Sequence, residues 1–115
     1  MSPRPSQISD ATVLVGGLGL GSRLVSTLGP YTGQSFPLSH APMTLGRAPD
    51  CDISLAADTS VSRSHARIVY ESSRHVLSDD GSSNGTSVNG AHLSAPHLLN
   101  SGDIIQMGET ALRYE

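Results

Sequence analysis

The sequence predicts an all-β domain, a sandwich or barrel of antiparallel strands, from three observations: the spacing of its turn signals, one alternating segment and one hairpin signal. The apolar runs are short, and turn signals interrupt them roughly every eight to twelve residues, as in antiparallel sandwiches. These turn signals are Gly29-Pro30, Tyr31-Thr32-Gly33, Ala48-Pro49-Asp50, Asp79-Asp80-Gly81, Asn84-Gly85, Asn89-Gly90 and Ser101-Gly102-Asp103.

The alternating segment is HARIVY, residues 65–70. Successive side chains of a strand point to opposite faces, so this segment predicts a strand with one buried face. Ala66, Ile68 and Tyr70 share one face, and His65, Arg67 and Val69 share the other. Further strands are expected at residues 23–28, 34–38, 43–45, 53–55, 75–78, 86–88, 104–107 and 110–114; only residues 22–28 could also form a helix, which Gly29-Pro30 would end.

The hairpin signal is Asn89-Gly90, which lies between the apolar residues Val88 and Leu93. A type I′ turn needs positive φ at both central residues, and Asn-Gly supplies it best. The second Asn-Gly, Asn84-Gly85, lies instead in the polar run of residues 79–85, which is long for a hairpin tip. That run predicts a loop that displays its side chains.

Composition limits the classes of function. The chain has 115 residues, a net charge of −3 and no lysine, so we expect one domain without the broad basic surface that nucleic-acid binding uses. Its one cysteine, Cys51, cannot form an internal disulfide, and residues 11–20 are too short to cross a membrane. We expect a cytoplasmic protein, because the chain has a single cysteine and does not open with a charged segment followed by a long apolar one. We expect a flexible tail or lead-in at residues 1–21, because the opening MSPRPSQISD is poor in large apolar groups.

A nucleotide loop is the alternative interpretation of the glycines in ATVLVGGLGLGSRLVSTLG, residues 11–29. The dinucleotide fingerprint needs glycine at its sixth position, where this chain has Ser22. No Asp or Glu stands between Asp10 and Asp50 to hold a ribose, and no lysine follows the glycines. The sequence favours a flexible lead-in to a first strand.

Three polar clusters stand beside expected strands: Gly46-Arg47, Ser62-Arg63-Ser64-His65 and Ser83-Asn84-Gly85-Thr86. In this order and spacing, with the closing segment GDIIQMGETALRYE, they resemble the forkhead-associated (FHA) domain. The resemblance extends from about Ser22 to Glu115 and implies a domain at residues 22–115. It implies an FHA-type (SMAD/FHA-like) sandwich of two antiparallel sheets with about eleven strands, whose recognition loops at one end bind phosphothreonine peptides.

The resemblance also implies roles for single residues. A phosphate dianion offers three acceptor oxygens, so its reader needs a cation and converging donors. Arg47 would grip the phosphate, the Ser62 hydroxyl would donate to it, and the side chain or amide of Arg63 would reach it. Asn84 would hold the peptide backbone, and Ser83 would lie beside the phosphothreonine methyl group.

His65 invites a catalytic interpretation, because Ser62, Ser64 and Asp58 are near it in sequence. Without a G-x-S-x-G elbow this proximity forms no triad, and the resemblance makes His65 a structural support of the recognition loops. Gly46 and Gly85 would serve the backbone, letting the loops turn.

We expect no metal site, because Cys51, His92 and His97 match no zinc spacing, and we expect no cofactor. Ser60 stands where some family members carry a basic residue that selects an acidic side chain three positions after the phosphothreonine, so that selection is not expected here. Ser83 replaces a frequent threonine, which weakens the expected discrimination against phosphoserine.

The sequence thus predicts a non-catalytic phosphothreonine-binding module, with a phosphorylated protein as partner and an upstream Ser/Thr kinase. Nucleic acid and membranes are not expected partners. The alternative is a phosphate-independent interaction or scaffold domain on the same fold. The sequence favours Thr12 as an ordinary threonine of a first strand, because Thr12-Val13-Leu14-Val15 has β propensity. The alternative is that a kinase phosphorylates Thr12 and that the domain binds this tail or that of a neighbouring copy.

Overall fold

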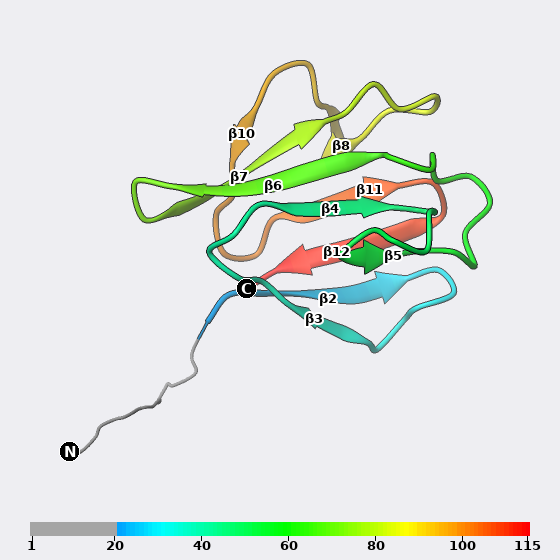
Figure 1. Ribbon diagram of the computed structural model, residues 1–115, viewed down its shortest axis with the longest axis horizontal. Coiled ribbons are helices and arrows are strands. Elements are labelled where there is room, and N and C mark those ends of the chain that lie inside the picture. Colours follow the sequence, from blue (N-terminus) through cyan, green and yellow to red (C-terminus); the bar gives the residue numbers. More distant parts are fainter. Residues whose placement is uncertain (1–20) are drawn as a thin grey trace.

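The computed structural model describes residues 21–115, which form two β-sheets packed face to face (Figure 1). This part of the chain has eleven strands and no helix, and so no helix that could cross a membrane. One sheet has the order β3 (Ser35–Pro37), β2 (Arg23–Leu28), β12 (Thr110–Tyr114), β11 (Ile104–Met107), β8 (Ser87–Val88) and β9 (Ala91–His92). The other has the order β10 (His97–Leu98), β7 (Arg74–Asp79), β6 (Ala66–Glu71), β4 (Met43–Gly46) and β5 (Ile53–Ser54).

The predicted eleven-stranded sandwich is confirmed, and one strand pair departs from the expected antiparallel order. β4 and β5 run parallel, with Leu45 opposite Ile53. Six residues suffice for this return because Asp52 anchors the chain beside the start of β4, where its carboxylate accepts the Thr44 N–H at 2.8 Å. Leu55 N–H then donates to Gly46 O at 2.7 Å and holds the end of the short strand.

The hydrophobic core lies between the sheets. One sheet contributes Leu24, Ile105 and Leu112, and the other contributes Leu45, Ile68 and Leu77; all are at most 1% exposed. Each such side chain contributes about 1.5 to 3 kcal/mol to folding through burial of apolar surface. Both sheets are therefore fixed by one continuous apolar layer.

The expected strands are present, with ends shifted by at most one residue, and residues 23–28 form β2 rather than a helix. The predicted hairpin is also confirmed: Asn89 and Gly90 join β8 to β9 with φ of 53° and 84°. The two-residue strand β10 was not expected, because so short a segment carries no period that a sequence pattern could reveal. β9 was implied only as the second arm of the hairpin, without bounds.

The alternation of HARIVY is correct for the strand and wrong for His65. Ala66 and Ile68 are buried, Arg67 is exposed and Tyr70 is half-buried, as expected for β6. His65 was expected on the same face as Arg67, but its side chain is completely buried. The strand begins only at Ala66, and His65 belongs to the preceding loop, where hydrogen bonds draw its ring inward.

The connections that matter for function lie at one end of the sandwich, on the right in Figure 1. This loop end comprises residues 47–52 after β4, residues 55–65 before β6, residues 80–86 after β7 and the turn at Gly108-Glu109 between β11 and β12. The opposite end carries the β6–β7 hairpin and the C-terminus. The expectation of loops gathered at one end is confirmed.

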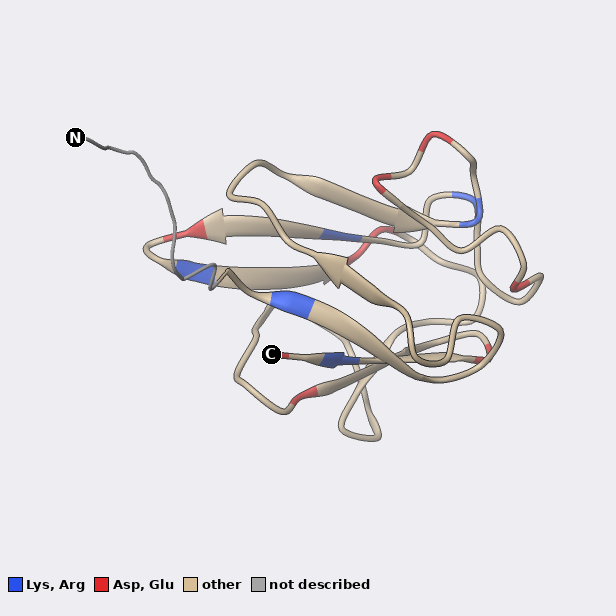
Figure 2. Ribbon diagram, turned by 90° about the horizontal axis from the view of Figure 1, so that it is seen from below, with Lys and Arg blue, Asp and Glu red and all other residues tan. Residues whose placement is uncertain are grey.

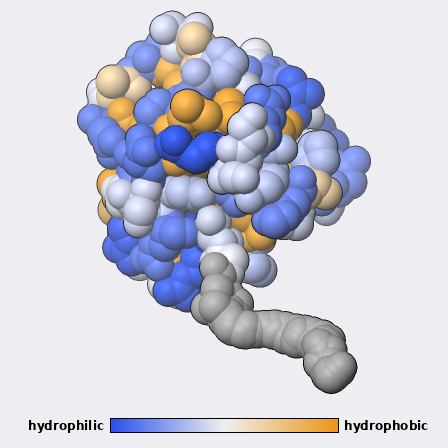
Figure 3. Space-filling model, turned by 90° about the vertical axis from the view of Figure 1, so that its left-hand side faces the viewer, coloured by the Kyte–Doolittle hydropathy of each residue, from blue (hydrophilic) through white to orange (hydrophobic). Residues whose placement is uncertain are grey.

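Charges are dispersed over the described residues. In Figure 2 most blue and red positions are spread over the ribbon, and two blue positions lie close together on the loops at the right. Figure 3 shows the end opposite to the loops, where hydrophobic residues lie between hydrophilic ones. The glycine-rich stretch at residues 11–20, Thr12 and the expected tail, apart from Gly21, lie outside the described residues.

Candidate functional site

Arg47 follows the last residue of β4 and is held by the loop that precedes β6. Its backbone N–H donates to Ser62 O at 2.9 Å, and its Nε donates to Val61 O at 3.0 Å. The side chain is half-buried. Because only Nε bonds to a described residue, the two terminal NH₂ groups of Arg47 are not engaged by residues 21–115. The loop therefore presents a cationic fork in a fixed position.

Gly46 permits a close approach of two backbone segments. A Cβ at this position would overlap the carbonyl of Arg63 and lie 3.1 Å from Cys51 Sγ. That carbonyl accepts the Ala48 N–H at 3.2 Å and the Cys51 S–H at 3.3 Å. The φ of Gly46 is not positive, so the backbone conformation does not require glycine here. The proximity of the Arg63 carbonyl does.

Ser62 and Ser83 connect the loop before β6 to the loop after β7. The Ser83 N–H donates to Ser62 Oγ at 2.9 Å. A serine hydroxyl that accepts one hydrogen bond still has its own proton to donate. Arg63, the next residue, is exposed and bonds to Ala48 and Cys51 only through its carbonyl. A hydroxyl donor and a second guanidinium thus lie in the same loop that holds Arg47.

The buried ring of His65 connects the loop before β6 to the loop after β7. Its Nδ1 accepts the Ser62 N–H at 3.0 Å, which places the ring proton on Nε2, and Nε2 donates to Gly85 O at 2.9 Å. Its backbone N–H donates to Leu45 O at 2.9 Å, and its carbonyl accepts the Asp80 N–H at 2.9 Å. Because backbone groups occupy both ring nitrogens, the imidazole is not available as a general base.

Asp79 shapes the loop after β7. Its carboxylate accepts the N–H groups of Gly81 and Ser82, each at 2.9 Å, and the hydroxyls of Ser82 and Thr86 at 2.6 and 2.7 Å. Burial alone would raise the pKa of Asp79, but these hydrogen bonds outweigh it and lower the pKa from 3.8 to about 2. The ionised carboxylate therefore fixes the start and the end of this loop together.

Asn84 and Gly85 form the tip of that loop. Asn84 is exposed, and its Nδ2 donates to Ser60 O at 2.9 Å, while its Oδ1 bonds to no residue in the described part of the chain. Gly85 has a φ of +80°, which a side chain would strain, and a Cβ there would lie 2.5 Å from His92 Cε1. The tip is thus held by hydrogen bonds to Ser60 and His65, and the His92 ring lies close to Gly85.

A pocket of about 270 Å³ adjoins Asn84 on the loop end. Its lining combines the tip of the loop with the β11–β12 turn: Ser60, Asn84, Gly85, Ser87, Gln106, Gly108 and Glu109. Sequence reasoning missed Gln106 and Glu109, because no local pattern relates them to an asparagine more than twenty residues earlier. Only the packing of the β11–β12 turn against the loops brings them together.

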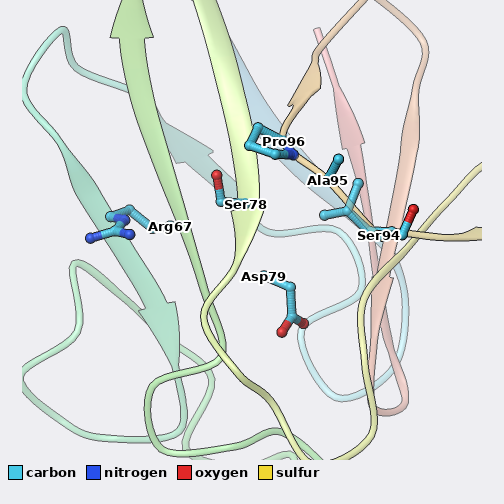
Figure 4. Close-up of a pocket in the computed structure, with 7 residues that line it drawn as sticks. Arg67, Ser78, Asp79, Ser94, Ala95 and Pro96 are labelled. Atoms are coloured by element: carbon cyan, nitrogen blue, oxygen red, sulfur yellow. The ribbon is translucent and has the colours of Figure 1, made fainter.

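A second hollow, of about 450 Å³, lies beside β7. Figure 4 shows Arg67 and Ser78 on neighbouring strands and Ser94, Ala95 and Pro96 on the other side of the hollow. The Arg67 guanidinium is 3.7 Å from the Asp80 carboxylate, a weak exposed ion pair. In the described residues, no three His, Cys, Asp or Glu side chains are grouped as a metal site would need.

The residues predicted for phosphate and peptide binding therefore come from three loops and meet at one end of the sandwich. The family model of the FHA domain matches residues 43–108, which contain all of them. This chain belongs to the FHA domain family. The matched segment runs from β4 to Gly108 and includes each of the three polar clusters that carried the resemblance.

Known FHA proteins match much of the chain. The glycogen accumulation regulator GarA of Mycobacterium tuberculosis is 39% identical over 112 residues, which are 96% of this chain and 68% of GarA. A solved structure from a study of phosphothreonine-dependent FHA domain interactions has a TM-score of 0.73 at 31% identity, covering 82% of this chain and 94% of that one. Mycobacterium tuberculosis EmbR, solved with a low-affinity phosphopeptide, has a TM-score of 0.77 at 30% identity, covering 89% of this chain and 26% of EmbR.

Proposed function

We propose that this FHA domain binds phosphothreonine segments of partner proteins at its loop end and catalyses no reaction. Arg47, Ser62 and Arg63 bind the phosphate, while Ser83 and Asn84 hold the peptide beside it. The observation that carries the proposal is the pair formed by the Arg47 fork and the Ser62 hydroxyl. Both are fixed by neighbouring loops, yet no described residue engages the NH₂ groups of Arg47.

The chemistry of this pair suits a phosphate dianion. Arginine presents two parallel N–H groups to two oxygens, and a hydroxyl can donate to the third. Each charge-assisted hydrogen bond contributes about 1.5 to 3 kcal/mol, and ordering the peptide offsets part of this. The expected affinity is roughly micromolar, and it falls strongly when the phosphate is absent.

The relatives support the same conclusion. One structural neighbour comes from a study of phosphothreonine-dependent FHA domain interactions, and EmbR was solved with a phosphopeptide. Our proposal includes a Ser/Thr kinase upstream, a cytoplasmic site of action, no cofactor and a binding domain that spans residues 22–115. A phosphorylated Thr12 would be one ligand, offered by the same chain or by a second copy.

The test is calorimetry with a phosphothreonine peptide library and its unphosphorylated counterpart. We expect binding of the phosphorylated peptides only, and a loss of at least about 100-fold for Arg47→Ala, since two charge-assisted bonds disappear. Arg74→Ala is the matched control, because Arg74 is an exposed arginine at the opposite end that bonds Asn100 Oδ1 at 2.8 Å. Equal binding of both peptide sets would instead support the phosphate-independent scaffold and refute the proposal.

A further inference from the structure

We propose that the pocket beside Asn84 receives a basic side chain, arginine or lysine, of the bound phosphopeptide, with Glu109 as its counter-ion. This proposal rests on the proposed function, because it concerns the peptide on either side of the phosphothreonine. It names the class of partner sequence that this domain selects: a phosphothreonine with a cationic residue a few positions away.

The pocket adjoins the peptide site and has room for one long side chain. Asn84, a predicted peptide ligand, forms part of its wall together with Ser60, whose carbonyl accepts the Asn84 amide at 2.9 Å. Ser87 and Gln106 lie directly opposite each other on β8 and β11 and line it from the sheet. The turn at Gly108-Glu109 completes the lining. A volume of about 270 Å³ corresponds to roughly nine water molecules at ~30 Å³ each.

The charge of this pocket is negative. Glu109 is its only ionisable lining residue, it is exposed, and it forms no ion pair within residues 21–115. No basic residue among residues 21–115 lines the pocket to neutralise it.

A second carboxylate strengthens this negative potential from inside the protein. Asp58 is 3% exposed and lies against Gly108, where a Cβ would approach its Oδ1 to 2.9 Å. It accepts hydrogen bonds from the Ser60 N–H at 3.0 Å, the Glu109 N–H at 2.8 Å and the Thr110 hydroxyl at 2.6 Å. All three donors are neutral, so the Asp58 charge is not compensated by a cation in the described residues.

The loop end is therefore polarised. Arg47 and Arg63 supply positive charge for the phosphate, and Glu109 with Asp58 supplies negative charge on the side of Asn84. An acidic peptide side chain in this pocket would face a carboxylate without a counter-ion. An apolar one would remove Glu109, Gln106 and Ser60 from water without giving them a partner. A guanidinium or ammonium group pairs with Glu109 and donates to the Gln106 and Ser87 oxygens.

The test uses phosphothreonine peptides with alanine at the flanking positions, in which arginine, lysine or aspartate replaces each alanine in turn. Calorimetry at pH 7.5 gives the ratio of the affinity for the arginine peptide to that for the alanine peptide. At one position we expect a preference of about three- to tenfold for arginine or lysine, as for a partly exposed ion pair, and discrimination against aspartate. The preference shrinks as the salt concentration rises.

Variants assign the preference to Glu109. Glu109→Gln keeps the backbone N–H that Asp58 accepts, and the ratio should fall to about one; Glu109→Arg should shift the preference toward aspartate. Glu71→Gln, at an exposed acid of the β6–β7 hairpin at the opposite end, is the matched control and should keep the full ratio. Unfolding midpoints verify that each variant is folded.

The outcomes separate this proposal from the proposed function. If phosphothreonine peptides bind with no basic preference, or if the preference survives Glu109→Gln, the pocket does not select a cation and only this proposal is refuted. If no peptide binds in a phosphate-dependent manner, the proposed function fails and this proposal fails with it.

Discussion

The two ends of the sandwich each contain a buried histidine, and the two imidazole rings have different hydrogen-bond partners. At the loop end, His65 bonds only backbone groups, the Ser62 N–H and the Gly85 carbonyl. At the opposite end, His75 is 3% exposed; its Nε2 lies 3.2 Å from Ser39 O and its Nδ1 lies 2.9 Å from the Tyr114 hydroxyl.

The surroundings of the two rings explain the difference. His75 lies in an aromatic cluster, with ring centroids 4.9 Å from Tyr70 and 5.7 Å from Tyr114, and His40 stacks on Tyr70 at 3.8 Å. Here polar groups satisfy one another inside the fold. At the loop end, His65 fixes the backbone instead and leaves loop side chains such as Arg47 available. A binding site therefore needs a rigid frame whose own hydrogen bonds leave the ligand-binding donors free.

The largest expected effect comes from replacing each histidine by phenylalanine. His65→Phe leaves the Ser62 N–H and the Gly85 carbonyl unpaired next to the core, which should lower the free energy of unfolding by about 2 to 4 kcal/mol. His75→Phe should cost about 1 to 2 kcal/mol, because the Tyr114 hydroxyl keeps its bond to Ser22 Oγ at 3.1 Å. Urea unfolding measures both values.

Phosphopeptide affinity separates the two variants. We expect at least a tenfold loss for His65→Phe, since its loops lose their shared support, and a change within about twofold for His75→Phe. If His65→Phe does not fold, His65→Gln, which can still accept and donate, serves instead and should bind with intermediate affinity. Similar affinity losses in both histidine variants would contradict the division between the two ends.

A smaller effect is expected from two aspartates, one near each end. Asp79 has a pKa of about 2 in the folded state, below its ordinary 3.8, so its stabilisation is complete above about pH 5 and is lost as the pH falls through 4 and then through 2. Asp79→Asn should therefore lower stability by about 1 to 2 kcal/mol at pH 6, with the difference shrinking as the pH falls and vanishing only below about pH 2. Denaturant titrations at several pH values give this profile.

Asp103 provides the matched variant. Burial would raise its pKa, but hydrogen bonds from the Asn100 N–H, His97 and Asn89 outweigh burial and hold it below its ordinary value. Asp103→Asn should lower stability with the same sign of pH dependence. Peptide affinity should fall about three- to tenfold for Asp79→Asn only, because Asp79 orders the loop that carries Ser83 and Asn84. An equal loss of peptide affinity in Asp103→Asn would contradict the prediction that the order of the loop after β7 determines affinity.

The smallest effect is expected from substituting two glycines whose backbone is left-handed. Gly85→Ala and Gly90→Ala should each cost about 1 kcal/mol through positive φ, which is +80° and +84°. Only at Gly85 would the new methyl group also displace a neighbour, the ring of His92, while nothing lies within 4 Å of that position at Gly90. We expect a two- to fivefold loss of peptide affinity for Gly85→Ala and none for Gly90→Ala, measured by fluorescence anisotropy.

Much of the fold could be predicted because local sequence patterns indicate most of its strands. Alternation in β6 and the turn at Asn89-Gly90 depend on neighbours within a few residues, and both are where the sequence pattern predicts them. The parallel pair of β4 and β5 could not be predicted, because it depends on a bond from Thr44 to Asp52 across the intervening loop. The roles of Arg47, Ser62, Arg63, Ser83 and Asn84 stay predictions, although their residues meet at one end.

Nine of the eleven strands, the turns and the three polar clusters could be derived from the sequence alone, since each of these is encoded by residues that are adjacent or regularly spaced. The burial of His65 between two loops and the position of Glu109 beside Asn84 depend on how the chain packs in three dimensions. The physical reason is that these arrangements depend on packing between segments twenty or more residues apart. No local period or turn propensity records such contacts, and they form only when both sheets close over the common core.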